Sequence, residues 1–428
     1  MIQFSLPGLE LNDKFKKIHS SLKTDGILGD YLPRFNFPDE PQFFQYMCER
    51  KSNLPYVRRG YGYGSSENKD EAITAAIAEA VEHYCLLHEQ EKLFVKDSYK
   101  NLGAKAVDPT SFEAFTKKQL EQKEFKKFRF DKNTEFNWIK GYSYPEEKEV
   151  LIPAQLVYAN YTRTQKREPI IQVPISTGAA CGPDFYFALY RGLCEIVERD
   201  NYMITYLSKI KANIIDLKTD SDLAVFEKRI ERYNLQLFCV DTALDFDFNS
   251  VVSIICDPTG IGPAVSIGLG GSLDPARAII SSGLEAVRRH IASRDRYFHQ
   301  GPLPAPQKGS TDWYNDQKLR LWSAPHMIET IRPFISGRKK AFEKLTNFSK
   351  PANKDNVSFI VKQLKQKGCR IFIADITIPQ VEAVGLKVLK VIIPELLPLF
   401  HDERYPYEGN NRLINSLRGK KLDPSHPF

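Results

Sequence analysis

The sequence predicts a mixed α/β fold in which related strand–helix units recur and their mixed sheets are covered by helices. Three segments, at residues 62–84, 178–200 and 268–290, each combine a small-residue turn with a helix-forming run. Short runs rich in β-branched and aromatic residues alternate with helical runs, which is typical of sheets covered by helices. The segments recur about a hundred residues apart, a spacing too long for a solenoid. We therefore expect three related units that pack around one shared site.

The three segments agree in register as well as in composition. An alanine precedes a glutamate by seven positions in each of them: Ala72 and Glu79, Ala188 and Glu195, Ala278 and Glu285. A second charged residue follows three positions later, as Glu82, Glu198 and Arg288. One pair of glutamates at this spacing would be weak evidence, whereas three matching features in register indicate related supersecondary units.

The helical positions of these charges favour a functional site. Residues three and four positions apart are neighbours on a helix, so Glu79 and Glu82 share one face. Their neighbours on this face include Ala75 and Ala78, while an apolar stripe that contains Ile77 faces the core. The alternative is a solvated helix face, which usually carries lysine and glutamine. The repetition of carboxylates among alanines in the second helix argues against that alternative.

Four carboxylates close together repel one another unless cations lie between them. Mg²⁺ prefers oxygen ligands and completes its shell with phosphate, so Glu79, Glu82, Glu195 and Glu198 are candidate metal ligands for a bound polyphosphate. Arg199, beside the second pair, is a candidate phosphate ligand. The sequence has neither a Walker A pattern nor a dinucleotide-binding glycine motif. It therefore predicts a nucleotide site built from helix carboxylates.

The main body is expected at residues 56–400, between two dissimilar ends. Residues 1–55 contain several prolines and predict an irregular lead-in. Residues 401–428 form a C-terminal tail, whose last part, 418–428, carries three basic residues and two prolines. Two segments of the body lack the repeated pattern. Residues 96–135, rich in lysine and glutamate, predict a peripheral helical segment. Residues 300–355, which begin GPLPAPQKGS, predict an insertion on the outside of the fold.

The remaining elements follow from local patterns. Strands are predicted at residues 136–143, 150–160, 237–241, 251–256, 264–269, 370–375 and 387–393. The run Asp-Pro-Thr-Gly-Ile-Gly between two of these strands predicts a hairpin. The third repeated helix is expected from about Ala276 to Arg294, where Arg288, Arg289 and Arg294 are candidate phosphate ligands. Asp375 and Thr377 either contact a ligand or cap a helix.

The amino-acid composition and net charge limit the kinds of protein and ligand that fit this chain. The 428 residues are 42% hydrophobic and 26% charged, as in an ordinary globular protein. The net charge of +7 suits an anionic ligand such as ATP or an acidic peptide, but it is too dispersed to indicate nucleic acid. Seven cysteines, an odd number without regular spacing, favour a reducing cytoplasm. No apolar run predicts a membrane span.

At the repeated segments the sequence resembles the YcaO domain superfamily. The matching motifs are Glu79-Ala-Val-Glu82-His-Tyr, the run from Ser176 to Asp200 that ends ExxERD, and the run from Gly385 to Pro394. The nearest branch is that of the D-proteins of azoline-forming cyclodehydratases. The resemblance implies ATP and Mg²⁺ as cofactors, bound by Glu79, Glu82, Glu195, Glu198, Arg199 and Arg289. It also implies that the tail brings Phe428 to the active site.

The resemblance further implies an activity and partners. Family members activate backbone amides of ribosomally made precursor peptides with ATP, and this branch forms thiazoline or oxazoline rings from Cys, Ser or Thr. An E1-like or leader-recognising partner protein and a homodimer are also implied. The chain departs from the family pattern at Pro183, Phe187 and Tyr63, where asparagine, glutamate and lysine are expected. Two alternatives therefore stay open: a thioamide- or amidine-forming enzyme, and a degenerate scaffold without catalysis.

Overall fold

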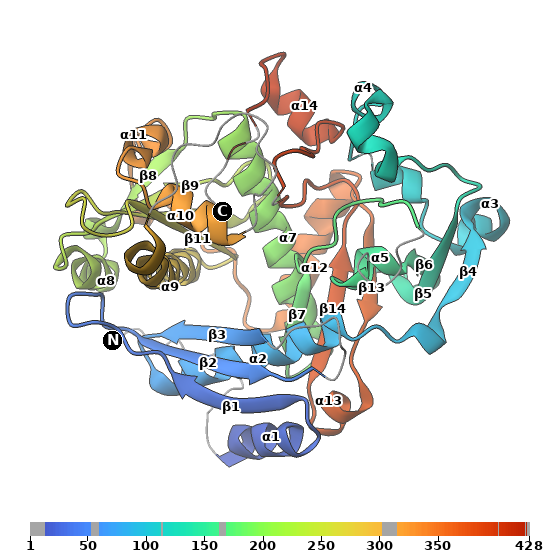
Figure 1. The fold of residues 1–428 in the computed structure, drawn as a ribbon, viewed down its shortest axis with the longest axis horizontal. Helices are drawn as coiled ribbons and strands as arrows, with labels where there is room; N and C mark the ends of the chain where they lie inside the picture. Colours follow the sequence, from blue (N-terminus) through green and yellow to red (C-terminus); the bar gives the residue numbers. More distant parts are fainter. Residues whose placement is uncertain are drawn as a thin grey trace.

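The computed structural model describes residues 13–52, 60–112, 114–161, 168–301, 315–400, 402–423 and 425. Three sheets surround a long central helix, α7 (Phe185–Leu207) (Figure 1). Each repeated segment forms an edge strand of one sheet and the helix that follows it. These pairs are called the first, second and third unit below: β3 (Gly60–Ser66) with α2 (Lys69–Leu87), β7 (Ala179–Gly182) with α7, and β11 (Val265–Ser272) with α9 (Pro275–Gln300).

The first sheet is antiparallel and has the order β1-β2-β3, with β1 at Leu28–Pro33 and β2 at Phe44–Arg50. Helix α2 covers one face, and α1 (Asp13–Thr24) packs beside β1. The predicted irregular lead-in at residues 1–55 is therefore wrong for its described part. Its prolines do not interrupt strands, because Pro33 ends β1 and the next two lie in the loop before β2.

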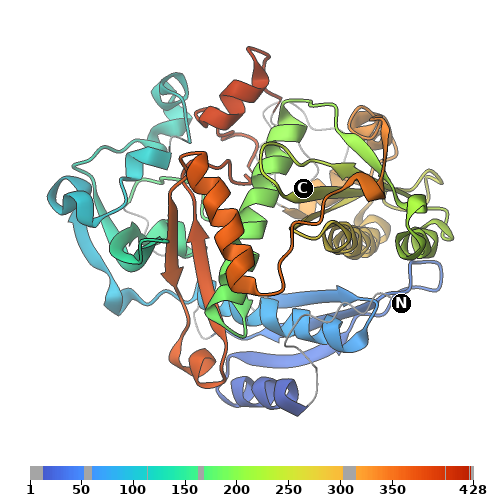
Figure 2. The same cartoon turned by 180° about the vertical axis from the view of Figure 1, so that it is seen from behind.

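The second sheet has the order β4-β5-β13-β14-β7, with β6 paired to β5 on the side. Helix α12 (Asn353–Gln366) packs beside α7, as seen from behind in Figure 2. All described pairings in this sheet are antiparallel. Its remaining strands are β4 (Val95–Ser98), β5 (Glu135–Tyr144), β6 (Lys148–Pro153), β13 (Ile371–Asp375) and β14 (Lys387–Ile392).

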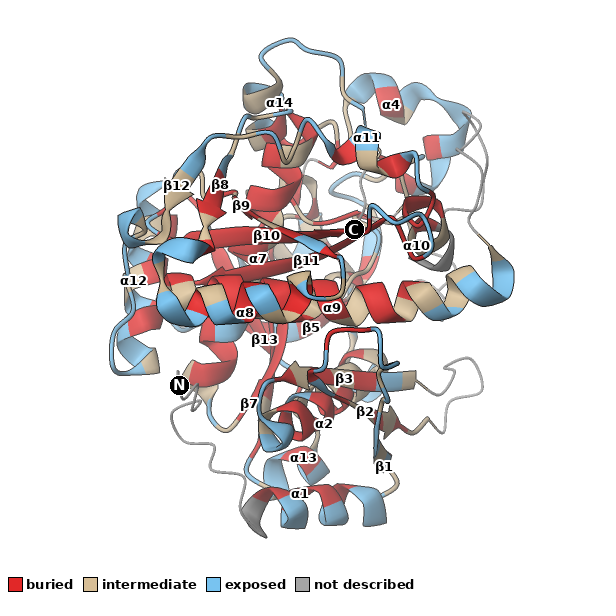
Figure 3. Cartoon of the chain, turned by 90° about the vertical axis from the view of Figure 1, so that its left-hand side faces the viewer, coloured by how far each residue is buried: buried red, intermediate tan, exposed pale blue. Residues whose placement is uncertain are grey.

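The third sheet has the order β11-β10-β9-β8-β12 and is covered by α9 and α8 (Ser221–Glu231). Strands β10 and β11 form the predicted hairpin and are buried along their whole length (Figure 3). Strand β12, from the segment predicted as an outside insertion, pairs in parallel with β8. That prediction is therefore wrong for β12. The remaining strands are β8 (Asn213–Asp216), β9 (Gln236–Asp241), β10 (Asn249–Cys256) and β12 (Lys339–Ala341).

Short helical elements connect and flank the sheets. The segment at residues 96–135, predicted to be peripheral and helical, contains a strand and several short turns of helix.

None of the helices in the described ranges is long and apolar enough to cross a lipid bilayer. The short elements are η1 (Glu91–Leu93), α3 (Tyr99–Leu102), η2 (Gly103–Lys105), η3 (Pro109–Phe112), α4 (Lys117–Glu121), η4 (Lys123–Phe128), α5 (Ala154–Val157), η5 (Leu217–Thr219), α10 (Asn315–Trp322), α11 (Met327–Ile331), η6 (Phe342–Lys344), α13 (Pro379–Ala383) and α14 (Asn411–Leu417).

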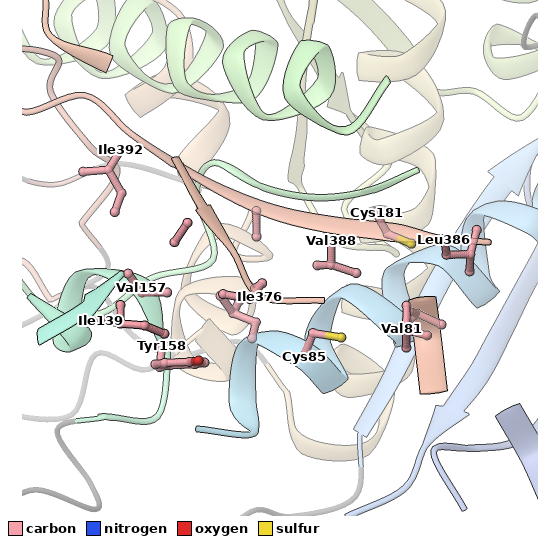
Figure 4. Close-up of a cluster of buried hydrophobic side chains, with 14 of the residues drawn as sticks. Val81, Cys85, Ile139, Val157, Tyr158, Cys181, Ile376, Leu386, Val388 and Ile392 are labelled. Atoms are coloured by element: carbon pink, nitrogen blue, oxygen red, sulfur yellow. The ribbon is translucent and has the colours of Figure 1, made fainter. Parts of the chain in front are cut away.

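Helix α2 joins the first sheet to the second. Glycines of β3 admit the helix backbone on one side, because a Cβ on Gly64 would overlap the carbonyl oxygen of Ala72. On another side, Val81 and Cys85 enter an apolar cluster with Val388 of β14 (Figure 4). Burial of one such aliphatic side chain contributes about 2 kcal/mol. The helix is therefore held between two layers, which fixes the position of its glutamates.

Candidate functional site

The three units meet at one cleft with a volume of about 1300 Å³. Residues of β3, β7 and β11 form part of its wall, and α2, α7 and α9 supply most of its charged side chains. Eight of these lie close to one another: Glu79, Glu82, Glu195, Glu198, Glu285, Arg199, Arg288 and Arg289. The structure thus brings together the repeated glutamates, as the shared register predicts.

A backbone hydrogen bond recurs in all three units. In each helix, the glutamate seven positions after the shared alanine accepts an N–H from the edge strand or from the turn that leads into it. The bonds join Tyr63 N to Glu79 Oε2 at 3.0 Å, Gly178 N to Glu195 Oε2 at 2.9 Å, and Leu269 N to Glu285 Oε2 at 2.8 Å. In the second unit the donor lies one position earlier relative to its glutamate. This bond orients one oxygen of each carboxylate toward its strand and leaves the other oxygen for the cleft.

Arginines pair with these glutamates within and between units. Arg199 lies 3.2 Å from Glu195 and 3.3 Å from Glu198 on the same helix. Arg288 joins the first unit to the third, because it lies 3.4 Å from Glu79 and 3.4 Å from Glu285. Arg289 also lies 3.5 Å from Glu285. The spacing of residues in the sequence does not predict this bridge between two units through Arg288.

Two carboxylates of the cleft are poorly compensated. Glu82 makes no hydrogen bond or ion pair with any described residue. Burial, together with the nearby carboxylates of Glu195 and Glu79, raises the pKa of Glu82 well above its ordinary value. Burial raises the pKa of Glu198 to about 8 even though Arg199 opposes the shift. Burial therefore disfavours the charged form of both carboxylates, and a bound cation would favour their ionised form.

The carboxylate set fits Mg²⁺ that is shared with a polyphosphate. Among the described residues, no three acidic, histidine or cysteine side chains form a ready-made metal cage. Mg²⁺ commonly takes only one or two protein carboxylates and fills its shell with water and phosphate oxygens. The buried carboxylates of Glu82 and Glu198 would supply such ligands. The roles of Glu79, Glu82, Glu195 and Glu198 as metal ligands remain a prediction.

Lys390 lies beside this centre and was not singled out from the sequence. Its ammonium is 2% exposed and donates hydrogen bonds to the carbonyl oxygens of Ile175 at 2.7 Å and Thr177 at 2.6 Å. Burial lowers the pKa of Lys390 to about 8, against the opposing charges of Glu195 and Glu82. The signal in the sequence is a lysine with apolar residues on both sides, in the run from Gly385 to Pro394 that also contains Lys387.

Other predicted site residues lie elsewhere. Arg294 is paired with Asp39 at 2.5 Å and does not line the cleft, so its prediction as a phosphate ligand is wrong. Asp375 and Thr377 also lie off the cleft, and the Asp375 carboxylate instead accepts the N–H of Thr377. Phe428, predicted to reach the active site, lies outside the described residues.

The three departures from the family pattern have distinct structural roles. Tyr63 contributes its backbone N–H to Glu79, so this contact does not depend on its side chain. Its ring lies 5.7 Å from the Arg288 guanidinium. Pro183 and Phe187 line the cleft at the start of α7, where they replace polar groups with apolar surface.

Comparison with known proteins places the chain in a family. The family model described as YcaO cyclodehydratase, ATP- and Mg²⁺-binding, matches residues 62–397. No curated protein sequence matches the chain. A heterocyclase solved in complex with substrate and cofactor shares the fold with a TM-score of 0.78 and 18% identity, over 96% of this chain and 57% of that one. The chain thus spans 57% of the length of that heterocyclase.

Two further structures share the fold. YcaO from Methanopyrus kandleri, solved with AMPPCP and Mg²⁺, has a TM-score of 0.65 and 15% identity over 90% of each chain. The E. coli microcin synthetase McbBCD complex with pro-MccB17 bound has a TM-score of 0.57 and 12% identity, over 86% of this chain and 88% of that one. The predicted mixed α/β YcaO fold is confirmed. Because the family model covers most of its residues, the chain belongs to the YcaO cyclodehydratase family of ATP- and Mg²⁺-binding domains.

Proposed function

We propose that the chain is an ATP-dependent cyclodehydratase that acts on backbone amides of a ribosomally made precursor peptide and forms thiazoline or oxazoline rings. The observation that carries this proposal is the convergence of three repeated units on one cleft, where two glutamates are buried beside other carboxylates. Membership of the YcaO cyclodehydratase family supports it.

In this proposal the residues of the cleft bind and position the reactants. Glu79, Glu82, Glu195 and Glu198 hold Mg²⁺, which when bound neutralises the charge of the polyphosphate. Arg199 and Arg289 stabilise phosphate oxygens through charge-assisted hydrogen bonds. Most of the rate acceleration then comes from positioning and electrostatics, as is common in phosphoryl transfer.

The proposed reaction balances without a covalent bond to the protein. A Cys, Ser or Thr side chain of the peptide attacks the preceding carbonyl carbon and gives up its proton. The carbonyl oxygen takes the terminal phosphoryl group of ATP, and ADP leaves. That attack of the side chain closes the five-membered ring. The C–O bond to the phosphorylated oxygen then breaks to release phosphate, the amide nitrogen loses its proton, and a C=N bond forms within the ring. The peptide loses the elements of one water for each ring.

The proposed partners follow from the family and remain to be tested. The E. coli neighbour is a complex of several proteins with pro-MccB17 bound. This supports an E1-like or leader-recognising partner for the present chain. A homodimer and a cytoplasmic location are further proposals, as is a contribution of the tail through Phe428.

Mass spectrometry of a candidate precursor peptide tests the proposal. The full chain, its partner, the peptide and Mg²⁺-ATP are incubated together, and phosphate release is followed in parallel. Loss of one water per modified residue, matched by one phosphate, is the expected result. Exchange of oxygen for sulfur would identify a thioamide-forming enzyme instead. Normal peptide binding without any ATP turnover would favour the scaffold.

A further inference from the structure

The turn that leads into β7 carries the backbone group that orients Glu195. This turn, at residues 175–178, is called the entry turn below, and Gly178 at its end donates its N–H to Glu195 Oε2 at 2.9 Å. Gly178 has a φ of +84°, and a Cβ on it would lie 2.4 Å from the carbonyl oxygen of Val391 in β14. The entry turn is therefore packed directly against β14, and its position determines where the Glu195 carboxylate points.

Lys390 of β14 holds the entry turn by its carbonyl groups. Its ammonium donates hydrogen bonds to the carbonyl oxygens of Ile175 at 2.7 Å and Thr177 at 2.6 Å. The next residue of the strand, Val391, donates its backbone N–H to the carbonyl oxygen of Gly178 at 2.8 Å. Two adjacent residues of one strand thus bind three of the four carbonyl groups of the turn, and the bonds from the ammonium are the charge-assisted ones.

The position of this ammonium is unusual for a side chain with only a packing role. Lys390 is 2% exposed, and burial of a charged group is unfavourable unless hydrogen bonds and nearby charges offset it. The carboxylates of Glu195 and Glu82 favour its charged form, but within the described residues its hydrogen bonds go to carbonyl groups of the entry turn. A methionine would fill the same space without a buried charge. What lysine adds at this position is therefore its hold on the turn and its positive charge.

We propose that Lys390 is a positioning residue of the nucleotide site, which acts through the entry turn to fix the Gly178 N–H and thereby the Glu195 carboxylate. The inference rests on the proposed function and adds to it a residue that acts through another residue. The alternative is that Lys390 acts by charge alone, and the two roles predict opposite signs. Removal of a cation near Glu195 and Glu82 would strengthen their attraction for Mg²⁺, whereas loss of the turn's position would weaken Mg²⁺ binding.

Isothermal calorimetry of the full chain with Mg²⁺-ATP measures that sign. Lys390→Met removes both the charge and the hydrogen bonds, and its affinity is expected to fall about tenfold. Lys390→Gln removes the charge but keeps an amide that can donate to two carbonyl groups, so its affinity is expected to stay within about threefold of the wild type. Lys387→Met is the matched control and should bind like the wild type, because Lys387 lies on the same strand and pairs with Asp375 and Glu382 outside the cleft.

Amide hydrogen exchange of the chain without nucleotide gives a second readout, which does not depend on the proposed function. The Gly178 N–H is expected to exchange at least about tenfold faster in Lys390→Met than in the wild type or in Lys390→Gln, because the entry turn is released only when the hydrogen bonds are lost.

Unchanged or tighter Mg²⁺-ATP binding by Lys390→Met would overturn the proposal, and so would wild-type exchange at Gly178 in that variant. If Lys390→Met does not fold, Lys390→Gln decides, because charge alone predicts binding about tenfold tighter than the wild type and positioning does not. If the wild type binds no Mg²⁺-ATP while Gly178 exchanges faster in Lys390→Met alone, the proposed function fails and the hold of Lys390 on the turn stands.

Discussion

In the first unit, β3 packs against α2 so closely that a Cβ on Gly64 would overlap the carbonyl oxygen of Ala72. In the third unit, β11 packs against α9 in the same way, with Gly270 against Ala278. In both units the glutamate seven positions after the shared alanine, Glu79 or Glu285, accepts an N–H from its strand. The two units therefore share one backbone scaffold.

Three positions after that glutamate the units differ in charge. The first unit has Glu82, which has no partner among the described residues. The third unit has Arg288, which neutralises Glu79 and Glu285 together. Although burial opposes it, Arg289 and Arg288 lower the pKa of Glu285. The difference shows that the small residues fix how strand and helix pack in each unit. The residue three positions after the glutamate fixes the charge that the unit brings to the cleft.

Breaking the scaffold should have the largest effect, and it should be equal in the two units. Gly64→Val and Gly270→Val each place side-chain atoms inside a helix backbone, which should cost about 3 kcal/mol or more. Urea unfolding measures the loss. Gly103→Ala is the control, because its positive φ of 54° makes the change unfavourable although no atom lies within 4 Å. Destabilisation in only one unit would contradict a shared scaffold.

Removing the unbalanced charge of the first unit should affect function rather than folding. Glu82→Gln should reduce peptide modification by about a hundredfold or more, because a ligand for Mg²⁺ is lost. Its melting temperature should stay equal or rise, because the variant no longer buries an unpaired charge. Glu124→Gln, at an exposed position, is the control. Full activity of the Glu82 variant would remove this residue from the site.

Removing the positive charge of Arg288 in the third unit should have a smaller effect than removing Glu82. Arg288→Gln leaves Glu79 and Glu285 without their shared cation, so the cleft repels a polyphosphate more strongly. Affinity for Mg²⁺-ATP should fall about tenfold, as expected for loss of one charge-assisted contact. Calorimetry gives the value, with Arg232→Gln as the control. Unchanged affinity would show that the bridge between the units is structural only.

The smallest expected effect is a pH dependence of folding stability, which arises from His290 in the third repeated helix. His290 of the third unit stands where Tyr84 stands in the first, and burial lowers the pKa of His290 to about 4. The unfolded chain thus binds more protons, so stability is lost as pH falls from about 6.5 toward 4. At pH 5.5 the loss should be about 1 kcal/mol relative to neutral pH. Urea unfolding of His290→Gln should show a correspondingly weaker dependence, and an unchanged dependence would contradict the assignment.

Much of the fold and of the cleft was predictable because the units repeat in register. Glycine, alanine and glutamate recur at fixed positions, and a shared pattern implies shared geometry. The bridge from Arg288 to Glu79 was not predictable, since it joins residues far apart in sequence that meet only after packing. The first sheet was missed because prolines were taken to exclude strands, whereas they lie at strand ends. Lys390 was missed because its place among apolar residues does not reveal that packing brings it close to Glu82 and Glu195.

The same limit applies to Arg191 and Arg277. They belong to different units, and each looks like an ordinary helix-surface charge in the sequence. Only the folded structure brings both into the lining of one cleft. Sequence patterns therefore predict which charged side chains each unit supplies, and the three-dimensional structure shows which of them lie close together.

The central claim is that the cleft shared by the three units binds Mg²⁺-ATP through the repeated glutamates. Isothermal calorimetry of the wild type beside a Glu195→Ala/Glu198→Ala variant tests it most directly. We predict Mg²⁺-dependent ATP binding by the wild type and at least about a hundredfold weaker binding by the variant, with both proteins equally folded by circular dichroism. Equal ATP affinity of the two proteins, or no binding by the wild type, would contradict the claim.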